Sequence, residues 1–281
     1  MRFTFSALLV ASITILSGCV AHVSENALLR PAAGTKLAEG SIGDWPWNVT
    51  SIEVPREDGA VLYAAHFTRK DAVALVLYFG GNGFVISKHH AVLLDVYNKH
   101  SVDVLIVDHR GYGGSSGVAS LDAMMADGVA VYDLACNLPM YHGKPIVVHG
   151  QSLGSFMAGE VANQRVLDGL VLESSATTAE EWVQGFVESS ILVRKGVVSG
   201  ELKGRGNLVV MRSLDEPVLI VVGDSDNTTR SEMSATLYSA ASVPSELKEL
   251  LIVPGAGHNN AVLGEAYSNA FSRLLTKATA R

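Results

Sequence analysis

Cysteine is scarce in this chain, and so are clusters of basic residues. The 281 residues include two cysteines, Cys19 close to the amino terminus and Cys136 in a predicted helix, so we expect no disulfide framework within the chain. We expect Cys136 to be packed in that helix rather than to act as a nucleophile. The formal charge is −7 and no basic cluster offsets it, which argues against nucleic acid as a partner.

Motifs for metal and phosphate binding are also missing from the sequence. It contains no His-Glu-x-x-His motif and no cysteine–histidine cluster with the spacing of a metal site. The glycine-rich stretch 111–117 lacks the Lys-Ser or Lys-Thr ending of a phosphate-binding loop. The sequence therefore predicts neither a metal nor a cofactor.

Apolar residues, in contrast, are abundant. They make up 48% of the sequence while charged residues make up 17%, which is the composition of a globular protein. A chain of this length can form one large α/β domain with a sizeable core.

The first residues predict an export signal. Arg2 supplies a positive charge, and residues 3–16 form an apolar stretch of the length of a signal-peptide core, too short and too weakly flanked for a membrane span. The segment ends in Leu-Ser-Gly-Cys at Cys19. This ending resembles the bacterial lipobox, in which the cysteine is lipidated and becomes the new amino terminus. An ordinary cleaved signal or an uncleaved anchor is the alternative.

A lipidated Cys19 would hold the protein in a membrane of the bacterial cell envelope, because each buried methylene adds about 0.8 kcal/mol. By resemblance to Gram-negative lipoproteins, Val20 in place of Asp favours the outer membrane, facing the periplasm. We therefore expect residues 1–18 to be a lipoprotein signal peptide and residues 19–50 to be a lipidated amino terminus and tether. A Trp-Pro-Trp sequence at 45–47 is expected to pack the tether onto the domain.

Strands and helices alternate along the rest of the chain. An Asp-Gly turn at 58–59 lies between two extended runs and predicts an antiparallel hairpin, 51–54 with 60–67. Apolar runs typical of strands covered on both faces then alternate with helical patterns. We expect strands at 72–79, 102–107, 145–148, 169–172, 218–222 and 249–253, and helices at 86–99, 121–138, 155–164, 229–241 and 259–276.

This alternation requires parallel strands joined by crossover helices. We therefore predict one domain at 51–281 of the α/β class, with a doubly wound, mostly parallel sheet and the hairpin as its antiparallel edge. The segment 174–215 interrupts the regular spacing and has a loosely amphipathic pattern around Trp182. Either a small cap over the pocket or a crossover with one or two extra helices fits this pattern.

Ser152 is the leading candidate for a nucleophile. It lies in Gly-Gln-Ser-Leu-Gly at 150–154, between the apolar run 145–149 and a helix-prone stretch. Glycines on both sides allow a sharp turn from strand to helix, which would hold the serine hydroxyl above the sheet. The next backbone amide, that of Leu153, would then point to where an oxyanion forms.

A serine needs a base, and the base needs a carboxylate. Of the nine histidines, His258 alone lies in a glycine-rich loop between the last predicted strand and the closing helix. The carboxylate should come from the loop after the strand at 218–222, where Asp224 and Asp226 are both candidates.

These stretches together make the chain similar to the α/β-hydrolase superfamily, and within it to the small serine hydrolases of the serine aminopeptidase-like group. The resemblance is carried by residues 78–83, 108–115, 150–154, 223–226 and 255–259. These stretches fall within 51–278, so the resemblance covers nearly the whole mature chain. One departure is Gly80, where many relatives have histidine in a His-Gly-Asn loop. Asp108 and Arg110 are expected to pin a loop rather than to touch substrate.

The resemblance implies roles for further residues. It favours Asp226 over Asp224 as the triad carboxylate, by its spacing from the strand, and gives the Ser152, Asp226, His258 order of the α/β-hydrolase fold. It makes the backbone amide of Asn82 the second oxyanion donor, with that of Gly83 as the fallback.

The sequence thus predicts a lipid-anchored serine hydrolase that cleaves an acyl bond, with a carboxylester as the default substrate. The partners expected are a small-molecule acyl substrate and a membrane; the oligomeric state stays open. The alternatives are an aminopeptidase, thioesterase or acyltransferase, and a non-catalytic envelope binding protein on the same fold.

Overall fold

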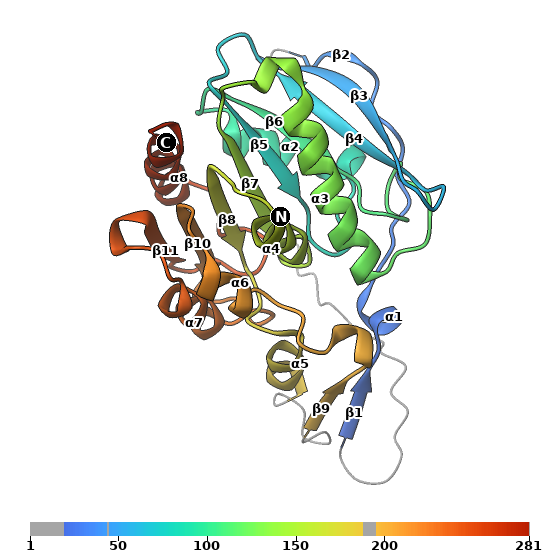
Figure 1. Ribbon diagram of the computed structural model, residues 1–281, viewed down its shortest axis with the longest axis vertical. Helices are drawn as coiled ribbons and strands as arrows, with labels where there is room; N and C mark the ends of the chain where they lie inside the picture. Colours follow the sequence, from blue (N-terminus) through green and yellow to red (C-terminus); the bar gives the residue numbers. More distant parts are fainter. Residues whose placement is uncertain (1–19, 44, 188–194, 281) are drawn as a thin grey trace.

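The computed structural model describes residues 20–43, 45–187 and 195–280, and a long central sheet runs through them (Figure 1). The predicted signal peptide and Cys19 lie outside these residues. No helix within the described ranges is long and apolar enough to cross a membrane.

The strands of this sheet follow the order β11-β10-β8-β7-β5-β6-β4-β3-β2. Neighbours from β11 to β6 are parallel, and β4, β3 and β2 add an antiparallel edge. This arrangement confirms the predicted fold class. The bounds are β2 Gly40–Ser41, β3 Asn48–Pro55, β4 Val61–Thr68, β5 Ala74–Phe79, β6 Val102–Val107, β7 Ile146–Gln151, β8 Gly169–Glu173, β10 Val218–Gly223 and β11 Lys248–Val253.

Helices cover both faces of the sheet, as parallel strands require. Residues of α2 and α8 pack on one face, and residues of α3, α4, α6 and α7 pack on the other. The helix bounds are α2 Ile86–Tyr97, α3 Leu121–Asn137, α4 Gly154–Gln164, α6 Leu208–Ser213, α7 Ser231–Ala240 and α8 Glu265–Thr279, with 3₁₀ turns at Pro139–Tyr141, Gly200–Leu202 and Ser245–Leu247.

Strand β5 illustrates why the apolar runs form central strands. All six of its side chains are buried. Because side chains alternate between the faces of a sheet, Leu75 and Leu77 pack into one core cluster, while Val76 and Tyr78 pack into the other. Burial of one such aliphatic side chain contributes about 1.5–3 kcal/mol, which fixes the strand in the middle of the molecule.

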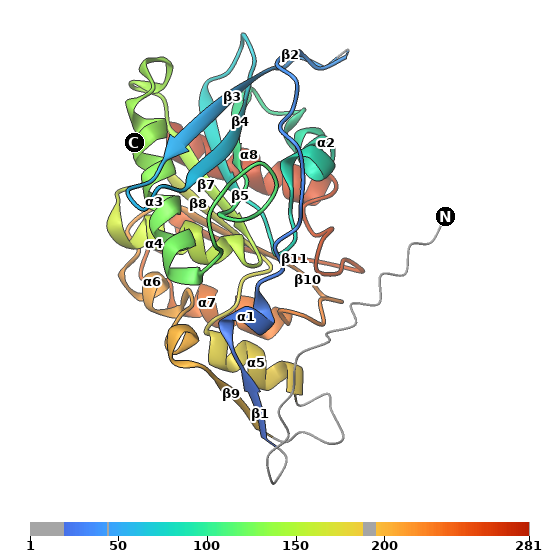
Figure 2. The same cartoon turned by 90° about the vertical axis from the view of Figure 1, so that its right-hand side faces the viewer.

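A second, smaller unit lies beyond one end of the central sheet (Figures 1 and 2). Strands β1 (Val20–Val23) and β9 (Lys195–Val198) form a parallel pair there, next to α1 (Glu25–Leu28) and α5 (Ala179–Val187). Two distant segments of the chain, the expected tether and the 174–215 segment, therefore meet in one unit. Residues 188–194 of that segment lie outside the described ranges.

The structure corrects two local expectations and confirms a third. The closing helix begins at Glu265 and not at 259, because residues 259–263 form turns, with the Leu263 N–H bonded to the Asn260 carbonyl at 3.2 Å. Cys136 is exposed on α3, so the expectation that it packs is wrong; Ala135 takes the inward position and the next residue turns to solvent. Trp47 is buried at 1% exposure and does pack onto the domain.

Candidate active site

The turn between β7 and α4 presents Ser152. Its φ angle is 52°, a left-handed conformation that a serine adopts only under strain. The Ser152 N–H donates to the Glu173 carbonyl at 2.9 Å, which holds the turn against β8. Glycine is required at 154, because a Cβ there would lie 2.0 Å from the Phe79 carbonyl oxygen. The sharp turn predicted from the glycine spacing is thus present.

His258 reaches Ser152 from the loop after β11. Its Nε2 lies 2.9 Å from Ser152 Oγ, so the hydroxyl can donate to the ring. The His258 carbonyl accepts from Ser174 Oγ at 3.1 Å and from Gln151 Nε2 at 3.4 Å. These contacts tie the histidine loop to the ends of β7 and β8. No motif in the sequence indicates these roles of Gln151 and Ser174.

Asp226 receives the other ring nitrogen. His258 Nδ1 lies 2.8 Å from Asp226 Oδ2, and the N–H groups of Thr228 and Thr229 donate to Oδ1 at 2.8 and 2.9 Å. Burial raises the pKa of this carboxyl, but the hydrogen bond and charge of His258 and the two amides outweigh burial and leave the pKa below its usual value. Asp226 is therefore a carboxylate, oriented to accept from the imidazole.

Asp224, the alternative carboxylate, lies elsewhere. It is exposed, and its Oδ1 accepts from the Gly255 N–H at 2.8 Å and from Ser225 Oγ at 2.9 Å. It joins the loop after β10 to the loop after β11. The structure thus brings Asp226, and not Asp224, to the imidazole.

The loop after β5 lies beside the serine turn. A Cβ at Gly81 would come 3.4 Å from Ser152 Cβ and 2.0 Å from Gln151 Oε1, so the two backbones approach closely. Within the described part of the chain, the N–H groups of Asn82 and Leu153 have no acceptor. Leu153 also precedes the first turn of α4, where the helix dipole favours negative charge. Both predicted oxyanion donors are therefore available for a ligand.

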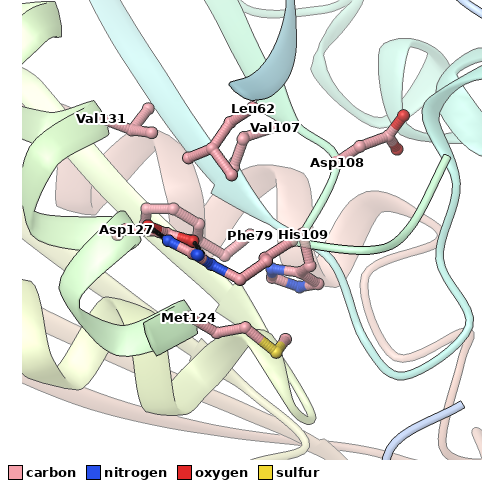
Figure 3. A pocket seen from close by; sticks show the side chains of 10 residues that line it. Leu62, Phe79, Val107, Asp108, His109, Met124, Asp127 and Val131 are labelled. Atoms are coloured by element: carbon pink, nitrogen blue, oxygen red, sulfur yellow. Dashed lines mark hydrogen bonds and ion pairs between the residues drawn. The ribbon is translucent and has the colours of Figure 1, made fainter. Parts of the chain in front are cut away.

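Two residues after β6, His109 and Asp108, hold this loop and the segments next to it. His109 Nε2 lies 2.6 Å from the Gly80 carbonyl, and Asp108 accepts from the N–H groups of Ile86 and Gly114, both at 2.8 Å. Burial raises the pKa of Asp108 to about 6. Figure 3 shows both side chains near a small cavity of about 10 Å³, about the size needed for one water molecule.

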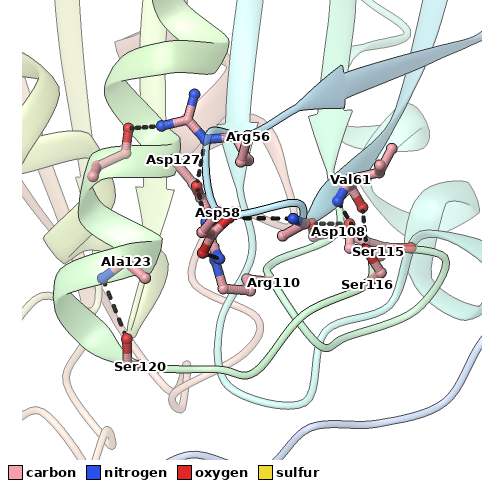
Figure 4. Close-up of polar contacts among 12 residues, drawn as sticks. Arg56, Asp58, Val61, Asp108, Arg110, Ser115, Ser116, Ser120, Ala123 and Asp127 are labelled. Atoms are coloured by element: carbon pink, nitrogen blue, oxygen red, sulfur yellow. Dashed lines mark hydrogen bonds and ion pairs between the residues drawn. The ribbon is translucent and has the colours of Figure 1, made fainter.

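Arg110 belongs to an ion-pair network away from the serine (Figure 4). Its guanidinium contacts both oxygens of Asp127, at 2.8 and 2.9 Å, and also Asp58, while Arg56 contacts Asp127 at 2.8 Å. The network joins the hairpin between β3 and β4 to α3. Arg110 therefore pins a loop, as expected, and its charge is already paired.

A cavity of about 660 Å³ opens onto Ser152 and His258. Its apolar lining comes from five elements or loops and includes Leu28, Leu121, Leu153, Phe156, Trp182 and Leu202. Leu29 and Arg30 add to the same wall. These amino-terminal residues were not among the predicted site residues, and their one signal in the sequence is the apolar run Ala-Leu-Leu at 27–29.

Among the described residues, no three His, Cys, Asp or Glu side chains gather as a metal site.

The sheet order and the turn after β7 are those of the α/β-hydrolase fold. Residues 70–203 match the family model described as serine aminopeptidase, S33. The predicted resemblance to this family of hydrolases is thereby confirmed over residues 70–203.

The similar proteins are diverse. An uncharacterized protein of Mycobacterium tuberculosis is 32% identical over 178 residues, 63% of this chain but only 60% of the relative's own length. Protein bem46 of Schizosaccharomyces pombe is 24% identical over 72% of this chain and 67% of its own. The Pyrococcus furiosus esterase Pf2001 shares the fold with a TM-score of 0.67 at 17% identity, over 87% of this chain and 98% of the esterase. Acetyl xylan esterase 1 of Thermoanaerobacterium shares the fold with a TM-score of 0.61 at 16% identity, over 86% of this chain and 87% of the esterase.

Proposed function

We propose that this protein is a serine hydrolase that cleaves a carboxylester through an acyl-enzyme on Ser152. The proposal rests on one chain of contacts, from Ser152 Oγ through the two ring nitrogens of His258 to Asp226, at 2.9 and 2.8 Å. Such a chain is what converts a neutral hydroxyl into a nucleophile.

In the first half of the reaction, Ser152 Oγ attacks the ester carbonyl carbon while its proton moves to His258 Nε2. The N–H groups of Asn82 and Leu153 stabilise the oxyanion, and Asp226 stabilises the imidazolium. The imidazolium then gives its proton to the alkoxide leaving group as the C–O bond breaks. In the second half, His258 takes a proton from water, hydroxide adds to the acyl-enzyme, and Ser152 leaves with the proton returned by the ring.

An ester is favoured over a peptide with a free amino terminus. The described residues that line the cavity include no carboxylate to bind an ammonium group, and Phe156, Trp182 and several leucines give the lining a large apolar part. Two similar folds carry the name esterase, which supports the same choice by analogy.

Labelling with a fluorophosphonate tests the proposal directly. Full-length protein should react covalently, and Ser152→Ala should abolish the label without loss of the fold. A panel of p-nitrophenyl esters of graded acyl length should then give turnover that Ser152→Ala reduces by several orders of magnitude. Folded wild-type protein that neither labels nor turns over any ester would favour the non-catalytic binding protein instead.

We also propose that Cys19 carries the lipid that anchors the protein in the cell envelope, at the outer membrane in a Gram-negative host. Two features support this, the Leu-Ser-Gly-Cys ending and the apolar stretch before it. Metabolic labelling with palmitate should mark the wild-type protein and not Cys19→Ala. Equal labelling of both would refute the assignment.

A further inference from the structure

We infer that the substrate is an ester with an apolar chain and a negatively charged group, bound between residues 20–37 and the described residues of the 174–215 segment, with Arg30 as the residue that binds the charge. We call residues 20–37 the amino-terminal arm. This inference rests on the proposed function and deepens it by naming the substrate class.

The arm is a fixed part of the site. The Asn82 side chain donates to the Leu28 carbonyl at 2.5 Å and accepts from the Arg30 N–H at 2.9 Å, so its amide pairs with the arm as a neighbouring strand would. The Tyr112 hydroxyl lies 2.9 Å from both Asn82 Oδ1 and the Arg30 nitrogen. The backbone at Arg30 is thus held by the loop that carries the proposed oxyanion donor.

Further contacts hold the arm along its length. The Gly113 N–H donates to the Ala32 carbonyl at 2.8 Å, and the Leu37 N–H donates to the Tyr63 hydroxyl at 2.8 Å. The Leu121 N–H is bonded to the Glu25 side chain. A wall fixed at this many points is suited to select a substrate, because little ordering cost remains for binding.

The cavity between the arm and the 174–215 segment suits an apolar chain. Leu28 and Leu29 line it from the arm, Trp182 and Leu202 from the segment, and Phe156 from α4. Each methylene that moves from water into such a cavity contributes about 0.8 kcal/mol. This part of the site therefore favours an acyl or alkyl chain over a polar group.

Arg30 supplies a charge at the same wall. Apart from His258, it is the one ionisable residue among the described residues that line the cavity. It forms no ion pair within the described part of the chain, whereas other arginines, such as Arg165 and Arg205, pair with aspartates. In a protein of formal charge −7, a cation at the cavity without a carboxylate partner is available to a carboxylate or phosphate of the substrate.

Matched substrate pairs test this inference. The first pair is p-nitrophenyl pentanoate and p-nitrophenyl hydrogen glutarate, which have five-carbon acyl groups and differ in a terminal carboxylate. The second is 1-butyrylglycerol and 1-butyrylglycerol 3-phosphate, which differ in a phosphate on the alcohol side. The proteins are the full-length chain, Arg30→Gln and the control Arg212→Gln, since Arg212 is also exposed but lies outside the cavity lining.

Arg30→Gln should lower kcat/KM about tenfold on an anionic substrate and leave its neutral partner within about twofold, while Arg212→Gln changes neither. A loss confined to one pair supports the inference and tells whether the acyl or the alcohol side faces Arg30. Unchanged turnover of both anionic substrates, or an equal loss on neutral ones, overturns it. If no ester is hydrolysed and Ser152 does not label, the proposed function itself fails.

Discussion

Replacing Asp226 by Asn should nearly abolish turnover while the fold persists. The Asp226 Oδ1 atom accepts two backbone N–H groups, and an Asn Oδ1 can do the same. The Asn Nδ2 would face His258 Nδ1, and because an amide nitrogen only donates, the ring would have to present a lone pair there. The ring proton would then lie on Nε2, pointing at Ser152 Oγ, and the ring could no longer take the serine proton.

This wrong tautomer should cost about 10⁴-fold in kcat, or about 5.5 kcal/mol of transition-state stabilisation. The matched control is Asp224→Asn, which keeps the Oδ1 acceptor for the Gly255 N–H and should leave kcat within about threefold. The assay is steady-state hydrolysis of a p-nitrophenyl ester at pH 7, where the depressed pKa keeps Asp226 ionised. Urea unfolding should report folded protein for both variants.

Near-wild-type kcat in Asp226→Asn, together with a large loss in Asp224→Asn, would mean that the wrong carboxylate has been assigned. Near-wild-type kcat in both variants would mean that the imidazole needs no carboxylate, and the proposed mechanism would be wrong.

Three further predictions concern the scaffold of the site. Asn82→Ala keeps the backbone N–H but removes the side-chain bonds to the arm at Leu28, so kcat should fall about tenfold with an unchanged circular dichroism spectrum. Gly154→Ala sets a methyl group against the Phe79 carbonyl and should lower the free energy of unfolding by about 1–3 kcal/mol in urea titrations. Between about pH 4 and pH 6, folded Asp108 holds a proton that the unfolded chain has released, so its contribution favours folding at pH 4 and is lost as the pH rises to 6. The stability of wild type relative to Asp108→Asn should therefore fall by about 2 kcal/mol between those pH values in urea titrations.

The sheet could be predicted from the sequence because its signals are local. The apolar runs of β5 and β7 are each continuous in the sequence, and their alternation with helical patterns requires parallel strands. Parallel strands end at one edge of a sheet, so side chains just after β7, β10 and β11 meet there although they are far apart in sequence. The meeting of Ser152, Asp226 and His258 follows from that rule, and the structure supplies the distances.

The cavity walls could not be predicted because they depend on contacts without local signals. Residues 20–28 are too short and too irregular to show a helical or strand period, and β1 is ordered by pairing with β9, where Val20 is opposite Lys195. In the sequence, Asn82 has the pattern of a turn residue. Its side-chain bonds to the arm, seen only in the structure, give it a second role. A pairing between such distant segments costs loop-closure entropy. It depends on how the side chains of the two segments fit together, and the periodicity of apolar residues in the sequence does not show this fit.

The residues proposed to carry out the reaction and the residues proposed to select the substrate therefore lie in different parts of the molecule. The proposed nucleophile, base and carboxylate follow strands β7, β11 and β10 of the central sheet. The arm contributes to the cavity wall and to the charge at it. A substitution at Arg30 should therefore change which ester is preferred while leaving the fluorophosphonate reactivity of Ser152 intact, whereas a substitution at His258 should remove both. Equal loss of labelling in the two variants would mean that arm and triad are not separable, and that the arm acts on the chemistry itself.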